Sequence, residues 1–332
     1  MPTTPTRLPI PHNRRLSMPS RSVTWRGYSL QLTTPPRKTS AHDKGAQVGS
    51  LIFKNPPPQP KFHRRSIEKA LAFRNVAADK GREQADIRGI VGDDDLSRKV
   101  RSIAWYHTIE LPGGIVTPGQ FDHRELVQNY GFPASLEGKR ALDVATFNGF
   151  WAFHMESLGA EVVAIDLDDP RDWDFPEPVA KELRATESGE ERIGSGFEVA
   201  HEALGSKVRR IGRSVYDLDP ETDGTFDFVH CGDVLVHLRD PLRALERIRA
   251  VTTGELLLSD GIDLVPRGGS WGPPIQYLGG WDDVVWWVPS LDALAQLVID
   301  AGFRDVKVNT VYNLAKTYET SGFWRASLTA VV

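Results

Sequence analysis

The chain has 332 residues, of which 25% are charged and 40% hydrophobic, an ordinary globular composition. The formal net charge of −4 at pH 7 excludes a molecule that is basic overall. A single cysteine, Cys231, excludes an internal disulfide and a cysteine-based metal site, and it fits a reducing compartment. No run approaches the ~18 apolar residues that a membrane-spanning helix needs. We therefore expect a cytoplasmic protein that binds no metal and no membrane.

Residues 1–60 differ in composition from the rest of the chain. They hold nine Lys and Arg and one acidic residue, a net charge of +8, so the remaining residues carry −12. They also contain eleven prolines, and their apolar residues follow no pattern. Such a segment cannot bury enough apolar surface to offset the entropy of ordering it. We predict a mostly disordered basic tail, with an arm that binds nucleic acid or a partner protein as the alternative.

Residues 61–135 are predicted to form a helical and irregular cap segment, a helical extension on the N-terminal side of the main domain. Leu96, Val100 and Ile103 fall roughly on helical spacing. An aromatic stretch rich in proline and glycine follows, from Trp105 to Arg124.

Strands and helices alternate from residue 136 to residue 332. Asp240 is a suitable helix N-cap, and Pro241 suits the first position of the helix that follows. This alternation predicts an α/β domain with a mostly parallel sheet and helices on both faces, which binds its ligand beyond the carboxyl ends of the strands. The predicted strands are residues 141–145, 161–165, 208–215, 226–230, 255–258, 303–310 and 324–332, and the predicted helices are residues 150–158 and those that begin after Asp240 and Ser290.

The segment from Asp143 to Asp166 carries the most information about a ligand. A strand with an acidic residue near its end, a turn of small residues, a helix and a second strand that ends in Asp166 describe a nucleoside-binding unit. A dinucleotide site needs Gly-x-Gly-x-x-Gly at the turn, whereas only Gly149 is present here. The Asp143 carboxylate would repel phosphates but attract the cationic groups of S-adenosyl-L-methionine (SAM). Asp166 is placed to bind ribose hydroxyls. The structural alternative is that Asp143 and Asp166 only cap turns.

From residue 103 to the C-terminus the sequence resembles the class I SAM-dependent methyltransferases, and more narrowly the group of the tRNA wobble-uridine 5-oxyacetate methyltransferases. The residues that carry the resemblance are Trp105 to Pro112, Thr117 to Gly119, the Asp143 turn and the run from Phe226 to Pro241. The resemblance implies a Rossmann-like, doubly wound sheet of seven strands, SAM as cofactor and S-adenosyl-L-homocysteine (SAH) as product.

The glycine turn of this class is altered here. Ala145 and Phe147 stand where the first two glycines of Asp-x-Gly-x-Gly-x-Gly are expected, so Phe147 must point away from the methionine or form a wall. Val236 stands where the wobble-uridine enzymes have a tyrosine, which favours ordinary SAM over a carboxylated cofactor. Asp217 is the best match for the acid that reads the adenine. The expected cofactor-binding residues are Asp143, Ala145, Thr146, Asn148, Gly149, Asp166, Leu167, Val215, Tyr216, Asp217, Gly232 and Asp233.

A methyltransferase has to align the acceptor with the methyl group and remove a proton when the acceptor is a hydroxyl. His237 and His107 are the candidate bases, and each has a structural role as its alternative. Aromatic side chains are the candidate lining of the substrate site, or else a packed lid over it. They are Trp105, Tyr106, Trp271, Tyr277, Trp281, Trp286 and Trp287.

The sequence thus predicts a SAM-dependent methyltransferase that acts on a hydroxyl or amine of a small molecule such as a metabolite, sugar or natural product. One alternative is a tRNA-modifying enzyme, although the charge of −12 outside the tail opposes it and only Arg209, Arg210 and Arg213 cluster locally. The other alternative is a catalytically silent protein with the SAM-binding fold. The oligomeric state does not follow from the sequence.

Overall fold

The computed structural model describes residues 22–25, 28–33, 50–53 and 94–332, without residues 178–179, 182–192, 265–271, 280–283, 318 and 320–321. The chain divides into two compact units, Met1–Gln59 and Pro60–Val332. In the first unit, β1 (Ser22–Trp25), β2 (Tyr28–Thr33) and β3 (Ser50–Phe53) form a small antiparallel sheet. These strands lie in the segment for which the sequence predicts little regular structure, and the predicted domain boundaries stay a prediction.

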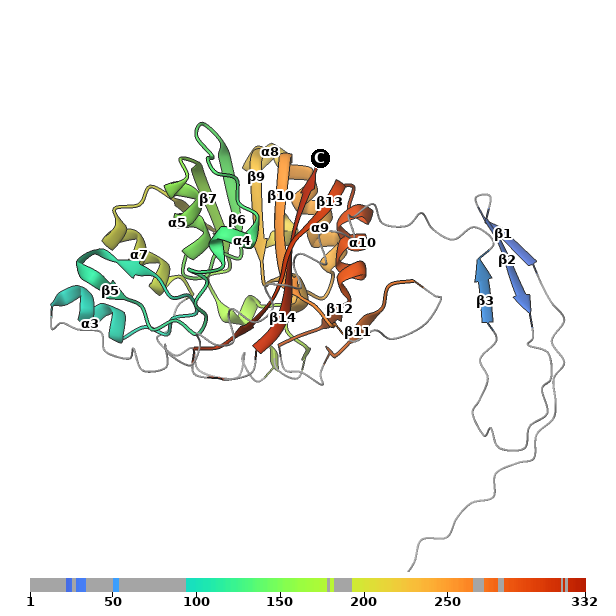
Figure 1. Cartoon of the computed structure of the whole chain (residues 1–332), viewed down its shortest axis with the longest axis horizontal. Coiled ribbons are helices and arrows are strands. Elements are labelled where there is room, and N and C mark those ends of the chain that lie inside the picture. The colour runs from blue at the N-terminus through green and yellow to red at the C-terminus, as the bar shows by residue number, and fades with distance from the viewer. Residues whose placement is uncertain are drawn as a thin grey trace, which may run out of the picture. The chain divides into compact units, whose positions relative to one another are not determined.

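The second unit is built on a seven-stranded sheet with the order β13-β14-β10-β9-β6-β7-β8 (Figure 1). The five strands from β10 to β8 run parallel, whereas β14 is antiparallel to both of its neighbours. This confirms the predicted Rossmann-like, mostly parallel sheet. The strands are β6 (Arg140–Val144), β7 (Glu161–Asp166), β8 (Arg209–Gly212), β9 (Phe226–Gly232), β10 (Thr252–Gly261), β13 (Arg304–Ala315) and β14 (Gly322–Val331).

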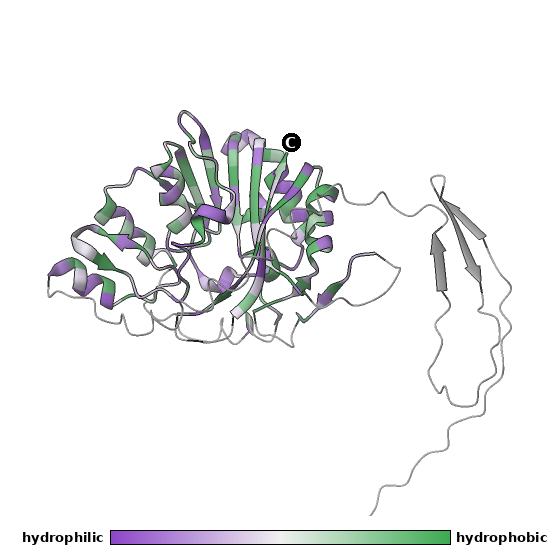
Figure 2. Cartoon of the chain, viewed as in Figure 1, coloured by the Kyte–Doolittle hydropathy of each residue, from purple (hydrophilic) through white to green (hydrophobic). Residues whose placement is uncertain are grey.

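Helices cover both faces of this sheet because its strands are apolar on both sides, as the hydropathy colouring of the central strands shows (Figure 2). One core packs α9 and α10 against Leu142, Val229 and Leu256, and the other packs α5 and α7 against Ala141 and Phe228. The helices are α3 (Asp95–Arg101), α4 (Val127–Tyr130), α5 (Phe150–Ser157), α7 (Ser195–Leu204), α8 (Pro220–Asp223), α9 (Pro241–Val251) and α10 (Leu291–Asp300).

Short elements complete the described part of this unit. The predicted caps are confirmed, because the side chains of Asp240 and Ser290 accept N–H groups in the first turns of α9 and α10. In the predicted cap segment, α3 falls where helical spacing was recognised, while the expectation for residues 61–93 lies outside the described residues. The remaining elements are β4 (Glu110–Leu111), β5 (Ile115–Val116), β11 (Ile275–Tyr277), β12 (Trp287–Pro289), η1 (Pro112–Gly114), η2 (Pro170–Asp172), η3 (Val215–Asp217) and η4 (Leu235–His237).

The strand order places a topological switch point between β6 and β9. From β6 the chain continues outward to β7 and β8 and then returns to β9 on the other side of β6. In sheets of this kind, ligands bind at such a point, in a crevice beyond the carboxyl ends of the strands. That end of the sheet is the lower edge in Figure 1. Among the described residues, no helix has the length and apolarity that crossing a bilayer requires.

Candidate active site

A buried acid and histidine lie side by side at the switch point. Asp143 on β6 is the register partner of His230 on β9, and each is 1% exposed. The two atoms His230 Nδ1 and Asp143 Oδ1 are 2.7 Å apart. The other carboxylate oxygen of Asp143, Oδ2, is buried and has no hydrogen-bond partner in the described part of the chain. A buried acceptor without a donor is costly, so this oxygen marks a place where a donor group of a ligand can bind.

The turn after Asp143 keeps the backbone shape that a glycine-rich turn would have. Ala145, Phe147 and Gly149 all have positive φ, of 59°, 46° and 91°. These are the three positions at which the resembled pattern has glycine. Holding a non-glycine residue in this left-handed conformation costs roughly 1–2 kcal/mol. Ala145 and Phe147 therefore adopt the backbone conformation that glycine favours, and the strain this stores lies at the edge of the sheet where a ligand is expected.

The Phe147 ring contacts Tyr106 of the cap segment. Its centroid is 5.4 Å from that of Tyr106. Whether this ring borders the methionine part of a bound cofactor stays a prediction.

Asp166, at the end of the neighbouring strand β7, binds the backbone of the turn. Its carboxylate accepts the backbone N–H of Phe147 at 2.7 Å and that of Leu167 at 2.8 Å. Burial raises the pKa of Asp166 to about 6, and the two N–H groups act in the opposite direction. A carboxylate has about four lone-pair positions, so two remain for a ligand.

These residues fit SAM. The unpartnered Asp143 Oδ2 suits the ammonium group of its methionine part, and the remaining lone pairs of Asp166 suit ribose hydroxyls. A pyrophosphate would lie between two carboxylates, which disfavours a dinucleotide. The fit thus rests on the hydrogen-bonding chemistry of Asp143 on β6 and Asp166 at the end of β7, the two acids that the sequence identified.

Several other predicted cofactor residues use their side chains within the fold. Asn148 is buried, and its Oδ1 accepts the N–H groups of Tyr106 at 2.7 Å and His107 at 3.2 Å, which fastens the cap segment to the turn. Tyr216 donates its hydroxyl to Asp174. Asp217 is exposed at the end of η3. The buried residues Thr146 and Val215 and the half-buried residues Leu167 and Gly232 also lie at the strand ends.

Asp233 belongs to a buried ion pair that the sequence analysis missed. Arg325 on β14 is 6% exposed, and its Nε lies 2.8 and 2.9 Å from the two carboxylate oxygens of Asp233. The Tyr106 hydroxyl lies 3.4 Å from the same carboxylate, and the Arg325 guanidinium lies over the Phe121 ring. Asp233 itself has a φ of 51°. This pair ties the loop after β9 to the last strand and to the cap segment.

The two candidate bases lie in different surroundings. His107 is buried in the cap segment beside His123, with ring centroids 5.4 Å apart, and burial lowers the pKa of His107 well below its usual value. His237 ends η4 and is half-buried, and its Nδ1 lies 2.5 Å from the Val284 carbonyl oxygen. A carbonyl only accepts, so Nδ1 carries the proton and Nε2 is left with a free lone pair.

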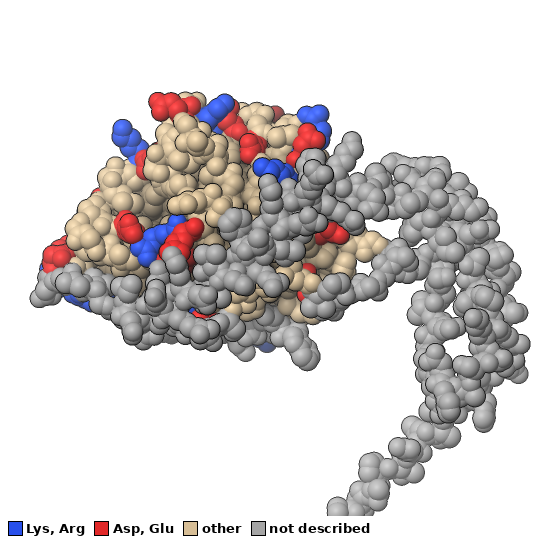
Figure 3. Space-filling view, viewed as in Figure 1, with Lys and Arg blue, Asp and Glu red and all other residues tan. Residues whose placement is uncertain are grey.

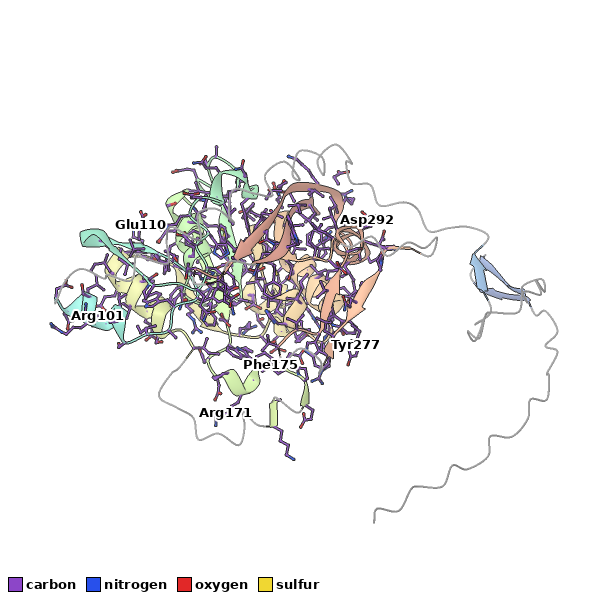
Figure 4. All side chains as sticks on the ribbon, turned by 60° about the horizontal axis from the view of Figure 1, so that its bottom comes forward. Arg101, Glu110, Arg171, Phe175, Tyr277 and Asp292 are labelled. Carbon is purple, nitrogen blue, oxygen red and sulfur yellow. The ribbon has the colours of Figure 1, made fainter. Side chains whose placement is uncertain are left out.

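The residues of the predicted aromatic lining are divided between the core and the surface. Trp105 is a core side chain that donates to the Val100 carbonyl, and Trp286 is 9% exposed. Tyr277 is 61% exposed and Trp287 half-buried, whereas Trp271 and Trp281 lie outside the described residues. Figure 4 turns the edge at the carboxyl ends of the parallel strands toward the viewer. It labels Phe175 and Tyr277, which lie on segments that border this edge.

A cavity of about 280 Å³ lies between η4, α9, α10 and the β11–β12 hairpin. Its walls are mainly apolar. Leu235 and Val236 of η4 line it, whereas His237 is not among the residues that line it. The side chains that line it include Leu235, Val236, Leu242, Asp260, Ile275, Trp287, Leu294 and Leu297.

Comparisons with known proteins agree on one family. The family described as "Methyltransferase domain" matches residues 122–308, more than half of the chain. The ubiquinone biosynthesis O-methyltransferase of Xanthomonas euvesicatoria pv. vesicatoria (strain 85-10) is 33% identical over 127 residues, which cover 37% of this chain and 44% of that protein. The protein of the same name from Xanthomonas campestris pv. campestris (strain B100) is 32% identical over 127 residues, covering 38% and 44%. The chain thus spans less than half the length of these curated relatives.

Among solved structures, the N-terminal domain of EvdMO1 with SAH bound is similar, with a TM-score of 0.50 and 18% identity. The likeness covers 74% of this chain and 100% of that one. At this identity the likeness shows the fold alone.

Proposed function

Because the chain belongs to the methyltransferase-domain family, we propose that it transfers the methyl group of SAM to a hydroxyl oxygen of a small, mainly apolar molecule. The family supports the sequence-based prediction of a SAM-dependent methyltransferase. When bound, SAM supplies a methyl group that its sulfonium already activates. The residues of the chain therefore have to bind and orient the two molecules and, for a hydroxyl acceptor, take up one proton.

The observation that carries the proposal is the fixed tautomer of His237. The Val284 carbonyl holds the proton on Nδ1, so Nε2 is available to accept a proton from an acceptor hydroxyl. We assign the general base to His237 rather than to His107, whose ring is sealed in the cap segment. Gly232 and Asp233 lead from the end of β9 to η4, which connects this base to the switch-point crevice.

The chemistry of the cavity supports an apolar acceptor. Leu235, Val236 and Trp287 form part of its walls, and such walls favour a ring or hydrocarbon chain over a sugar or a phosphate. The curated relatives are named as O-methyltransferases of ubiquinone biosynthesis, which agrees with an oxygen acceptor on an apolar molecule. An amine, the other acceptor class that the sequence leaves open, needs the same alignment with the methyl group and is the alternative to this proposal.

A tRNA acceptor and the narrower wobble-uridine resemblance have less support. Arg210 lies 2.6 Å from Asp168, and Arg213 lies 2.9 Å from Asp223, so carboxylates within the fold partly neutralise this local arginine cluster. On the face shown in Figure 3, basic and acidic side chains lie interspersed. Binding along a phosphate backbone calls for a continuous basic surface.

The test is the formation of SAH from SAM with a panel of phenols, aliphatic alcohols, arylamines and unmodified tRNA. We expect turnover with a hydroxylated apolar compound and a fall in kcat of about 10²–10⁴-fold in His237→Gln. His201→Gln on α7 is the matched control and should keep the parental kcat. Turnover with tRNA alone would contradict the proposed acceptor class. An unchanged kcat in His237→Gln would contradict the assignment of the base.

A further inference from the structure

His230 is a buried titratable residue that the proposed reaction does not use. It lies in the middle of the sheet, on a strand whose neighbouring residues Val229 and Cys231 are fully buried apolar side chains. Burying an imidazole there is unfavourable unless both ring nitrogens have partners. Both do, since Nδ1 lies 2.7 Å from Asp143 Oδ1 and Nε2 lies 3.5 Å from the Tyr130 hydroxyl.

The direction of these hydrogen bonds follows from the chemistry of the three groups. An ionised Asp143 can only accept, so Nδ1 carries a proton and donates it to Oδ1. In a neutral imidazole Nε2 is then an acceptor, and the Tyr130 hydroxyl donates to it. The Tyr130 ring is itself held by stacking on Trp151, with centroids 4.2 Å apart. The chain Tyr130–His230–Asp143 thus fixes the imidazole orientation and tautomer.

The neighbouring residue leaves room for this arrangement. A Cβ atom at Gly232 would lie 2.8 Å from His230 Cε1 and 3.4 Å from the Tyr130 hydroxyl. The shorter of these two contacts forces a neighbour to move, so a larger residue at position 232 would displace the imidazole. Gly232 lies at the end of β9 and is the register partner of the buried residue Ser259. The close fit therefore depends on the absence of a side chain at this position.

We propose that His230 is a positioning residue, whose Nδ1–H holds the Asp143 carboxylate so that Oδ2 faces the ammonium group of the cofactor. With Oδ1 occupied by His230, Oδ2 is the carboxylate oxygen that remains without a partner among the described residues. Without the N–H donor, the carboxylate would lose its fixed orientation and part of its stabilisation in a buried place. This inference rests on the proposed function, and it adds the residue that orients the Asp143 carboxylate.

The test compares His230→Phe, which keeps a ring but removes the donor, with His230→Asn, whose side-chain N–H can occupy the place of Nδ1. Titration calorimetry measures the Kd for SAH and for 5′-methylthioadenosine, which lacks the amino-acid part. We expect His230→Phe to weaken SAH binding by about 10–100-fold, the usual effect of a hydrogen bond to a charged group. The affinity for 5′-methylthioadenosine should stay unchanged, and His230→Asn should restore most of the affinity for SAH.

Equal losses for both ligands, or unchanged SAH binding in His230→Phe, would overturn the inference, because a merely structural histidine gives those results. Unmeasurable binding of either ligand to the parental protein would instead refute the proposed function. If His230→Phe does not fold, Tyr130→Phe keeps the ring and removes the hydroxyl that faces Nε2, a hydroxyl that also interacts with Ser259 and Tyr312. It should weaken binding of SAH and not that of 5′-methylthioadenosine, and no change in either Kd would overturn the inference.

Discussion

Replacing Ala145 by glycine should stabilise the protein, although it removes a methyl group. Ala145 has a φ of 59°, which costs an L-residue roughly 1–2 kcal/mol. Glycine removes this strain but raises the entropy of the unfolded chain, at a cost of roughly 0.5–1 kcal/mol. The net gain in the free energy of unfolding is about 0.5–1 kcal/mol, and a domain of this size should gain about 1–4 °C in Tm.

The reverse substitution at Gly149 provides the matched comparison. Its φ is 91°, and a Cβ atom there would lie 2.5 Å from Phe153 Cε2 and 2.7 Å from Phe197 Cδ2. Gly149→Ala therefore adds both strain and overlap, and we expect a loss of about 2–4 kcal/mol. Urea unfolding followed by circular dichroism measures both values. A stability loss in Ala145→Gly, or an unchanged stability in Gly149→Ala, would refute the left-handed geometry of the turn.

Two further predictions concern buried charges. Burial, reinforced by the charge of Asp233, raises the pKa of Asp260 from 3.8 to about 7, so the folded state holds this proton more tightly than the unfolded state. The free energy of unfolding should therefore fall as the pH rises from about 4 to about 7, and Asp260→Asn should flatten that dependence in urea titrations; an unaltered slope would contradict the shift. Asp233→Asn leaves Arg325 buried without its counter-charge and should lower stability by about 3–5 kcal/mol. The double variant Asp233→Asn with Arg325→Met should recover part of that loss in thermal unfolding, and a neutral single variant would show that the ion pair is unimportant.

The sequence was sufficient to predict the strand and helix pattern around Asp143 and Asp166. There the apolar runs are short, and their ends carry clear turn residues. It was also sufficient for the helices after Asp240 and Ser290, where a side-chain cap marks the first turn. The helix α7 was missed because Gly194, which precedes it, offers no side-chain cap.

The pairing of distant residues was beyond reach of the sequence alone. His230 reads as one polar residue in an apolar strand, and its link to Asp143 depends on β6 and β9 being neighbours. Arg325 lies 92 positions from Asp233, near the end of the chain, and no local pattern connects them. Both contacts follow from strand order, which is set by the packing of the whole sheet.

The predicted roles of Asp217, Tyr216 and the aromatic lining show that local sequence order does not determine the direction of a side chain. Local order places them near the crevice, but only three-dimensional contacts decide where each side chain points. The Tyr216 hydroxyl bonds to Asp174, and Trp105 lies in the core. Their contribution to ligand binding stays a prediction that variants can test.

Titration of SAH into the protein and into its Asp143→Asn variant tests the proposed cofactor site most directly. The amide keeps an acceptor for His230 but removes the negative charge beside the turn. We predict micromolar binding to the parental protein and a loss of about 10–100-fold in the variant, since an ammonium group would lose its charged partner. Equal affinities, or no binding at millimolar SAH, would contradict the proposed cofactor site at the end of β6.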